Sequence, residues 1–142
     1  MNDPVNQARR RLTEGGFTCV VLNQGEEFCS HERGVKPLLM LLQSNSSYHG
    51  AVAADKTVGA GAAHLYVLLG VKTLWANVIS ASALQILQSI GISVTYETLV
   101  PHIINRKGDG VCPIETAVAP AQTSQEAYDL IVEALKRLQA NG

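Results

Sequence analysis

Asp55 and Lys56 are the first side chains in this sequence whose types and spacing could do chemistry. They follow a run of small residues at 50–54 that predicts a strand, and a helix is expected to begin at Lys56 with Asp55 as its cap. In open α/β sheets, ligands gather beyond strand ends, where helix N-termini offer free N–H groups. Lys56 would then hold a phosphate or carboxylate or act as an electrophile, with Asp55 as a proton acceptor. A capping residue and a solvated lysine explain the same pair without any site, and both interpretations stay open.

Two glycines, Gly59 and Gly61, stand near the start of this expected helix. A glycine inside a helix costs up to about 1 kcal/mol relative to alanine, so two of them suggest that something approaches the backbone closely. That neighbour is the sheet, another helix or a ligand, and both glycines are therefore candidate ligand-binding residues. They do not form a dinucleotide-binding motif, because His64 occupies the position of the third glycine.

Cys112 and Glu115 form a second candidate group, in a Cys-Pro-Ile-Glu stretch. A cysteine at a helix start can have a lowered pKa and act as a nucleophile. Arg106 would lower that pKa further if the loop folds back, and either His102 or Glu115 would have to serve as the base. A buried thiol before a proline turn explains Cys112 more simply. We keep Cys112 as a candidate catalytic residue, with Arg106 and Glu115 as candidate ligand-binding residues.

Lys36 lies between a glycine and the start of an apolar helix expected at 38–42, which again suits an anion, although an exposed turn explains it as well. His31 follows Cys29 at a spacing that resembles half of a metal site, but no second half has a matching spacing. His64 falls within an apolar helix and is expected to be a core or interface histidine. We predict no metal site and no cofactor.

The elements that must position these residues are a helix, a hairpin, and then helices alternating with strands. Alternating helices and strands predict parallel neighbours covered on both faces, and the hairpin adds antiparallel pairing. We therefore expect one α/β domain over 1–142, a three-layer α/β/α arrangement with a mixed sheet. The expected helices lie within 1–16, at 38–42, from 56 to 69, at 84–90 after a cap at Ser80 or Ser82, and within 122–140; the expected strands lie at 19–22, 27–30, 50–54, 73–79 and 92–97.

The composition excludes several classes of function. Hydrophobic residues make up 46% and charged residues 16% of the 142 residues, which is enough for a sizeable core. The formal net charge of −1 gives no electrostatic attraction to nucleic acid or to an acidic membrane. No signal peptide or membrane span is apparent, and three irregularly spaced cysteines suit a reducing compartment. We expect a cytoplasmic protein with neither nucleic acid nor a membrane as partner, and with apolar helix faces that favour homo-oligomers.

Several stretches resemble a small family of unknown function with a cytidine deaminase-like fold. They lie at residues 33–38, 54–59, 99–101, 105–106 and 112–115. Zinc deaminases carry a His or Cys with a nearby Glu at one helix start and a Pro-Cys-x-x-Cys at the next. Here the expected helix starts read Asp-Lys-Thr-Val at 55–58 and Ser-Ala-Ser-Ala at 80–83, so the resemblance implies the fold without the zinc.

The resemblance implies a small-molecule site at the pocket where deaminases bind their substrate. Asp55 and Lys56 would bind or catalyse, Ser80 and Ser82 would line the pocket, and Cys112 and Glu115 would close it. The expected ligand is a small anion, such as a nucleotide or a phosphorylated metabolite. The alternative is a non-enzymatic ligand-sensing or interaction module. Loss of turnover in a folded Lys56→Ala variant would distinguish the enzyme from the sensor.

Overall fold

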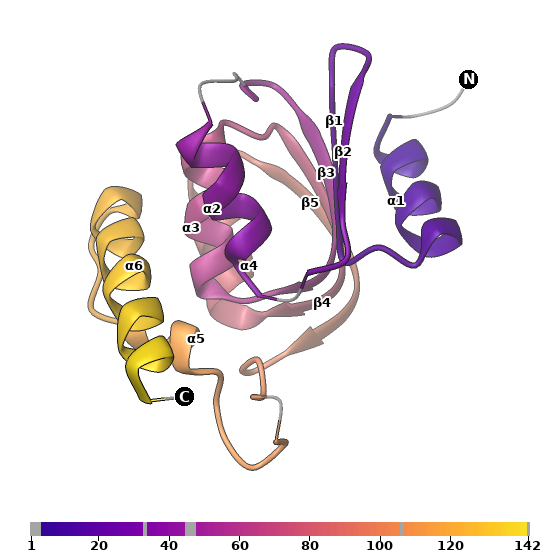
Figure 1. Ribbon diagram of the computed structural model, residues 1–142. Helices are drawn as coiled ribbons and strands as arrows, with labels where there is room; N and C mark the ends of the chain where they lie inside the picture. Colours follow the sequence, from indigo (N-terminus) through magenta and orange to yellow (C-terminus); the bar gives the residue numbers. More distant parts are fainter. Residues whose placement is uncertain (1–3, 33, 45–47, 106, 142) are drawn as a thin grey trace.

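The computed structural model describes residues 4–32, 34–44, 48–105 and 107–141. Figure 1 shows the elements coloured along the chain, and every expected helix and strand is present. The helices are α1 (Pro4–Gly15), α2 (Lys36–Gln43), α3 (Ala60–Leu69), α4 (Ala81–Ser89), α5 (Pro113–Ala117) and α6 (Ser124–Asn141). The strands are β1 (Cys19–Asn23), β2 (Glu26–Ser30), β3 (Val52–Val58), β4 (Thr73–Ser80) and β5 (Ser93–Val100).

The five strands form one mixed sheet in the order β2-β1-β3-β4-β5. The hairpin β1–β2 is antiparallel, and β1 also pairs antiparallel with β3. Strands β3, β4 and β5 are parallel to one another, because α3 and α4 carry the chain back between them. The expectation of a mixed sheet is confirmed.

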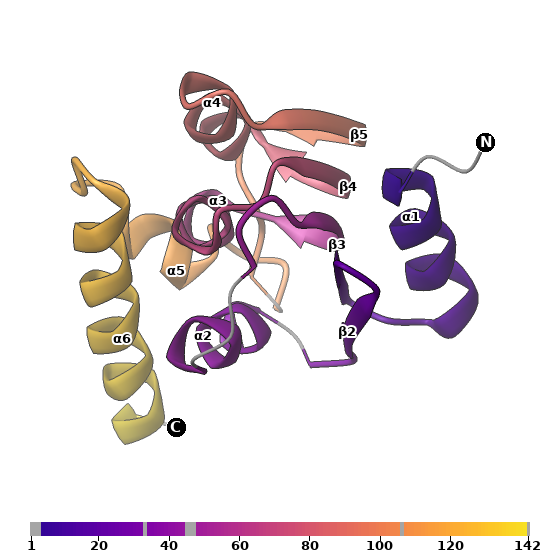
Figure 2. The same ribbon diagram turned by 90° about the horizontal axis from the view of Figure 1, so that it is seen from above.

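Helices cover both faces of the sheet, as the expected three-layer arrangement requires. Figure 2 shows α1 alone on one face and α2, α3 and α4 side by side on the other. Helix α6 lies outside this helix layer, where it packs against α3 and α5. Helix α3 is therefore enclosed between the sheet and α6, which explains why its apolar residues run all round it.

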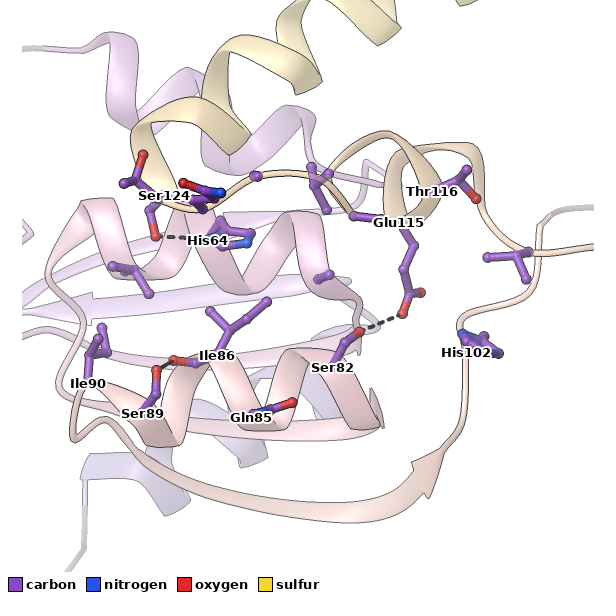
Figure 3. Close-up of a pocket in the computed structure, with 18 residues that line it drawn as sticks. His64, Ser82, Gln85, Ile86, Ser89, Ile90, His102, Glu115, Thr116 and Ser124 are labelled. Carbon is purple, nitrogen blue, oxygen red and sulfur yellow. Dashed lines mark hydrogen bonds between the residues drawn. The ribbon is translucent and has the colours of Figure 1, made fainter.

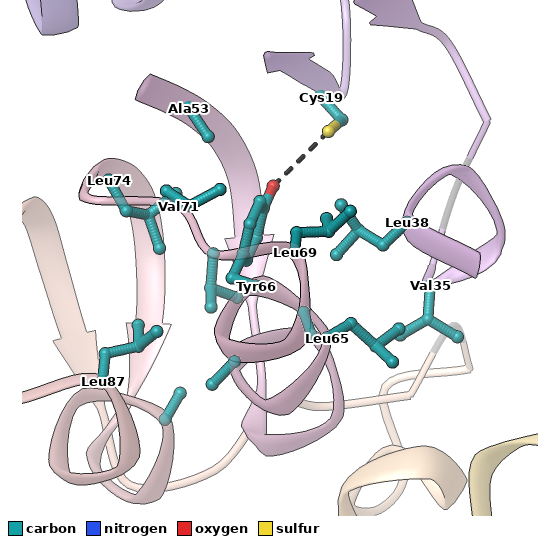
Figure 4. Packing of buried hydrophobic residues seen from close by; sticks show 14 of the residues in the cluster. Cys19, Val35, Leu38, Ala53, Leu65, Tyr66, Leu69, Val71, Leu74 and Leu87 are labelled. Carbon is teal, nitrogen blue, oxygen red and sulfur yellow. Dashed lines mark hydrogen bonds between the residues drawn. The ribbon is translucent and has the colours of Figure 1, made fainter. Parts of the chain in front are cut away.

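The core is divided by the sheet into two clusters. The larger one lies between the sheet and the helix layer and includes Leu38, Leu65, Tyr66 and Leu74, which Figure 4 shows packed around α3. The smaller one lies under α1 and includes Trp75. Few aromatic rings are needed, because small and branched aliphatic side chains fill most of the space.

Strand β3 continues beyond its expected end, so the predicted helix start at Lys56 is wrong. Asp55 and Lys56 lie inside the strand, and α3 begins only at Ala60. Thr57 and Val58 pair with Val78 and Ile79 of β4, since a central strand keeps its backbone satisfied by extending the ladder. The start of α3, which was expected to form part of the site, therefore lies four residues later in the chain than predicted.

Strand β5 also extends further than expected, to Val100, and it is mostly exposed rather than half-buried. It lies at the edge of the sheet, and α1 packs against β1, β3 and β4. Within the residues that the structure describes, none of the helices has both the length and the apolar character that crossing a membrane requires.

Candidate functional site

Asp55 belongs to a buried network rather than to an open site. Its side chain is 8% exposed; the Tyr66 hydroxyl donates to its Oδ2 atom at 2.6 Å, and the Thr57 N–H donates to its Oδ1 atom at 3.1 Å. Cys19 Sγ lies 3.4 Å from the same hydroxyl (Figure 4). Burial raises the pKa of Asp55 to about 7, against the opposing effect of these hydrogen bonds.

Lys56 and Lys36 lie on the surface, one on a strand and the other on a helix. Lys56 is exposed in β3, where its backbone N–H donates to the carbonyl of Thr18 at 2.9 Å. Lys36 is exposed at the first position of α2. Asp55 is buried whereas Lys56 and Lys36 are exposed, so the structure places the carboxyl group and the two ammonium groups in different environments, and their predicted roles stay predictions.

The two glycines near the start of α3 accommodate another helix. A Cβ atom on Gly61 would lie 2.5 Å from Ile114 Cγ2, and one on Gly59 would lie 3.2 Å from Glu115 Oε2. Ile114 and Glu115 both belong to α5. The close neighbour of Gly61 is therefore a helix, one of the three that the sequence allowed. Gly59 faces both α5 and the loop after β5, since its Cβ atom would also lie 3.1 Å from Ile103 Cγ1.

Glu115 is the charged side chain that α5 places next to the start of α3. It is 7% exposed; Ser82 Oγ donates to its Oε1 atom at 3.2 Å, and the Ile103 N–H donates to its Oε2 atom at 2.8 Å. Ser82 also lies 3.3 Å from Ser80, whose side chain caps α4 by accepting from the Ala83 N–H. The carboxylate thus lies between the starts of α3 and α4, where helix dipoles favour a negative charge.

A cavity of about 770 Å³ opens beside Glu115, between α3, α4, α5 and the start of α6. Figure 3 shows His64, Ser82, Gln85 and Glu115 on its walls, with His102 at one side. Among the described residues that line it, Glu115 is the only one with a side chain of full charge. The remaining lining consists of Ala60, Val67, Ile86, Ser89, Ile90, Val111, Thr116, Val118, Ala119, Ala121, Gln122, Thr123 and Ser124.

His64 forms a polar pair on the wall opposite α4. Its Nδ1 atom lies 3.0 Å from the hydroxyl of Ser124, the first residue of α6 (Figure 3). Burial lowers the pKa of His64, so the ring is neutral near pH 7. The cavity therefore offers a neutral imidazole and several hydroxyl and amide groups facing one carboxylate.

The residues at the two helix starts do not fit a catalytic zinc ion. The α3 start supplies Gly59 and Ala60, and the α4 start supplies the hydroxyls of Ser80 and Ser82, whereas zinc in deaminases takes imidazole and thiolate ligands. Throughout the described residues, no three His, Cys, Asp or Glu side chains are grouped so that they could hold a metal ion.

Residues 7–135 match the family described as TM1506, domain of unknown function (DUF1893). The chain belongs to the DUF1893 family. The crystal structure of a DUF1893 family protein (TM1506) from Thermotoga maritima is similar to this DUF1893 chain, with a TM-score of 0.84 and 23% identity over 96% of this chain and 91% of that one. The family resemblance read from the sequence is confirmed. No curated protein matches the chain.

Two structures of dCMP deaminase from the cyanophage S-TIM5 also align with this DUF1893 chain. The apo form has a TM-score of 0.49 and 14% identity over 70% of this chain and 100% of that one. The form in complex with dCMP and dUMP has a TM-score of 0.48 and 12% identity over 68% of this chain and 98% of that one.

The residues predicted as a site in this DUF1893 protein separate into two groups. Ser82 and Glu115 line the cavity. Ser80 contacts Ser82, and Gly59 lies next to Glu115. Among the described lining residues, the cavity wall includes neither Cys112 nor Lys36. Arg106 lies outside the described residues. The predicted roles of all these residues stay predictions.

Sequence reasoning missed the contribution of the start of α6. The capping residues Thr123 and Glu126 correctly mark where α6 begins, with the Glu126 N–H donating to Thr123 Oγ1 at 3.1 Å. The missing information was that this start packs against α3, which brings Ser124 to His64. No spacing in the sequence carries that contact, because 60 residues separate the two side chains.

Proposed function

We propose that this DUF1893 protein binds a small polar molecule in the cavity between α3, α4, α5 and the start of α6, with Glu115 accepting N–H groups of the ligand. The observation that carries the proposal is a nearly buried carboxylate on the wall of a cavity of about 770 Å³. That volume lies within the range of small-molecule sites, and a few convergent polar groups on an otherwise apolar wall are typical of them.

The charge of the lining selects the chemistry of the ligand. Glu115 is acidic, His64 is held neutral by burial, and the described lining includes no lysine or arginine. A free phosphate or carboxylate in the cavity would face Glu115 without a compensating cation. We therefore propose an uncharged or cationic head group with N–H donors, such as an amide, an amine or a nitrogen heterocycle. A nucleotide meets this condition with its base in the cavity and its phosphate in solvent.

A sensing role follows from the way Glu115 is held. Its two oxygens accept from Ser82 on α4 and from the backbone of Ile103 in the loop after β5. A ligand N–H group that bonds to the same carboxylate shares an oxygen with one of these donors and so alters the geometry of that hydrogen bond. Ligand occupancy would therefore change how the loop after β5 is held against α4. A partner protein that binds this loop would recognise the change.

A second candidate function is supported by the contact between His64 and Ser124. A serine hydroxyl 3.0 Å from a neutral imidazole nitrogen is an arrangement in which the imidazole can take the serine proton. Ser124 Oγ would then attack the acyl carbon of a bound ester or amide, the bond from that carbon to the alcohol or amine would break, and His64 would pass the proton to this leaving group. Water would then hydrolyse the acyl-enzyme to a carboxylic acid and free Ser124. Ser124→Ala distinguishes the two functions, because it abolishes turnover in a hydrolase and leaves the affinity of a sensor nearly unchanged.

The test is a thermal-shift and calorimetric screen of the full chain with two panels of compounds. One panel holds nucleobases, nucleosides, amides and amines; the other holds inorganic phosphate, sugar phosphates and carboxylates. A ligand present at about a hundred times its dissociation constant stabilises the folded state by about 2.7 kcal/mol, which is a shift of several degrees for a domain of this size. We expect shifts from the first panel and none from the second.

Two variants place the binding in the cavity. Gln85→Trp fills the cavity from α4 and should abolish the shift, whereas Gln139→Trp, at an exposed position near the end of α6, should leave it unchanged. Glu115→Gln keeps the shape of the side chain and should weaken a ligand that donates N–H groups. A ligand that binds Gln85→Trp as tightly as the wild type would overturn the proposal.

A further inference from the structure

We infer that β5 pairs with β5 of a second copy of this chain, so that two sheets join edge to edge across a two-fold axis at Tyr96. The inference does not depend on the proposed function. It rests on three features of the β5 edge. No strand of the described residues pairs with its outer side, it lacks the usual protection against strand pairing, and the elements around it carry almost no charged residues.

Within the part of the chain that the structure describes, no strand lies on the outer side of β5. The strand is eight residues long and stands at the end of the row in Figure 2, with β4 as its neighbour. Among the described residues, its one backbone hydrogen bond outside the β4 ladder joins the Ser93 N–H to the carbonyl of Lys72, which directly precedes β4. Most of its side chains are exposed, including Tyr96 at 40% and Leu99 at 45%.

The two edges of the sheet differ in how they are protected against pairing. Soluble proteins protect edges with short strands, charged side chains, prolines or bulges. Strand β2 has five residues, two of which are the exposed Glu26 and Glu27. Strand β5 contains no proline, glycine or lysine, and its one charged residue, Glu97, already lies 3.8 Å from Arg9 of the same chain. Strand β2 is thus protected against pairing with a strand of another chain, and strand β5 is not.

The elements beside β5 are equally free of charge. From residue 73 to residue 100, through β4, α4 and β5, Glu97 is the only Asp, Glu, Lys or Arg, although such residues make up 16% of the chain. Helix α4, which packs against β5, has none. A surface that meets a copy of itself brings identical groups together, so the lack of charge suits a second copy of this chain as the occupant.

The positions of the side chains decide the register. A two-fold axis perpendicular to the sheet places α1 of both copies on the same face of the joined sheet. Opposed residues of antiparallel strands point to the same face, so one residue at the axis must lie opposite the same residue of the second copy. An axis at Glu97 would place two carboxylates opposite each other, which is destabilising. Of the remaining registers, the one centred on Tyr96 pairs the longest stretch, residues 93–99.

In this register Tyr96 lies opposite Tyr96 of the second copy, on the face that also carries α4. Opposed side chains on paired antiparallel strands have Cβ atoms about 4.5–5.5 Å apart, so the two rings can contact each other. Glu97 lies opposite Thr95 of the second copy and keeps Arg9 as its own partner. The contact closes on itself, and it therefore gives a dimer rather than a fibre.

The experiment is sedimentation of the full chain with two charge variants of Tyr96. We expect the wild type to have twice the 15.2 kDa mass of one chain, and Tyr96→Lys and Tyr96→Glu each to sediment as folded monomers. An equal mixture of the two variants should recover the dimer, because opposite charges then face each other at the axis. Met40→Lys, which places the same charge on an exposed apolar position of α2, should stay dimeric.

A wild-type chain that remains monomeric would overturn the inference. So would a dimer that Tyr96→Lys leaves intact, since the contact would then lie elsewhere. Folded monomers of both variants that fail to associate on mixing would also exclude the Tyr96-centred pairing. Circular dichroism of each variant separates loss of the dimer from loss of the fold.

Discussion

Replacing Asp55 with asparagine should remove a large part of the pH dependence of stability. Asp55 accepts hydrogen bonds from the Tyr66 hydroxyl and the Thr57 N–H while buried in β3. An asparagine can keep both contacts: its oxygen accepts from Thr57, and its amide nitrogen donates to the Tyr66 oxygen. The Tyr66 proton then turns towards Cys19 Sγ, 3.4 Å away. The variant should fold, and it lacks an ionisable group at this position.

The size of the effect follows from the pKa of Asp55. Burial raises that pKa from 3.8 to about 7, and each pH unit of difference corresponds to about 1.4 kcal/mol. Because the pKa is higher in the folded chain, the folded state holds the proton more tightly than the unfolded state does. The resulting stabilisation is complete below pH 3.8 and is lost as the pH rises through about 7. The total loss is about 4 kcal/mol, of which about 3 kcal/mol falls between about pH 5 and about pH 8.

Urea unfolding at a series of pH values measures this loss. The difference in free energy of unfolding between wild type and Asp55→Asn cancels the contributions of other titrating groups. We expect this difference to shift by about 3 kcal/mol in favour of the variant as the pH rises from about 5 to about 8. Asp129→Asn, at an exposed position on α6, controls for the loss of one acidic side chain. A difference that stays constant with pH would refute the reasoning.

Three further predictions concern the helix starts and the surface. Gly61→Ala should lower the stability by about 1–3 kcal/mol, because the new Cβ atom would lie 2.5 Å from Ile114 Cγ2; thermal unfolding measures it. Ser80→Ala should cost about 1 kcal/mol through loss of the cap on α4, as urea unfolding can test, and an unchanged midpoint would show that the cap contributes nothing. Lys56→Ala should change stability by less than about 0.5 kcal/mol and leave the affinity for any ligand of the cavity unchanged in calorimetry, since Lys56 is exposed in β3.

Local patterns in the sequence were sufficient to predict the elements and the class of the fold. Ser80 caps α4, and Gly70 ends α3 in a left-handed conformation with φ of 80°, both at positions where residue type alone indicates a boundary. The prediction failed where a polar residue lies inside a buried strand. Asp55 is typical of a cap, but Tyr66 of α3 provides it with a hydrogen bond within the core, so the strand runs past it.

The candidate site was predicted only in part, because its walls come from segments far apart in the chain. Ser82 and Glu115 were both expected near a pocket, and they are in contact at 3.2 Å. The predicted site at Lys56 depends on a helix starting there, and β3 instead runs through Lys56 to Val58. The cavity wall opposite α4 depends on how α6 packs on α3, and no short-range pattern contains that information.

The position of α5 links the glycines to the cavity. Helices α3 and α4 follow the neighbouring parallel strands β3 and β4, so their N-termini lie at the same edge of the sheet and together favour a negative group there. Glu115 supplies that group only because Gly59 and Gly61 leave room for α5 against the start of α3. A side chain at Gly61 would push against Ile114 of α5, and one at Gly59 would press on Glu115 itself and on Ile103, so either would disturb how α5 is held beside the cavity. Under the proposed function, replacing Gly61 should therefore weaken a cavity ligand as well as lower the stability, even where the chain remains folded.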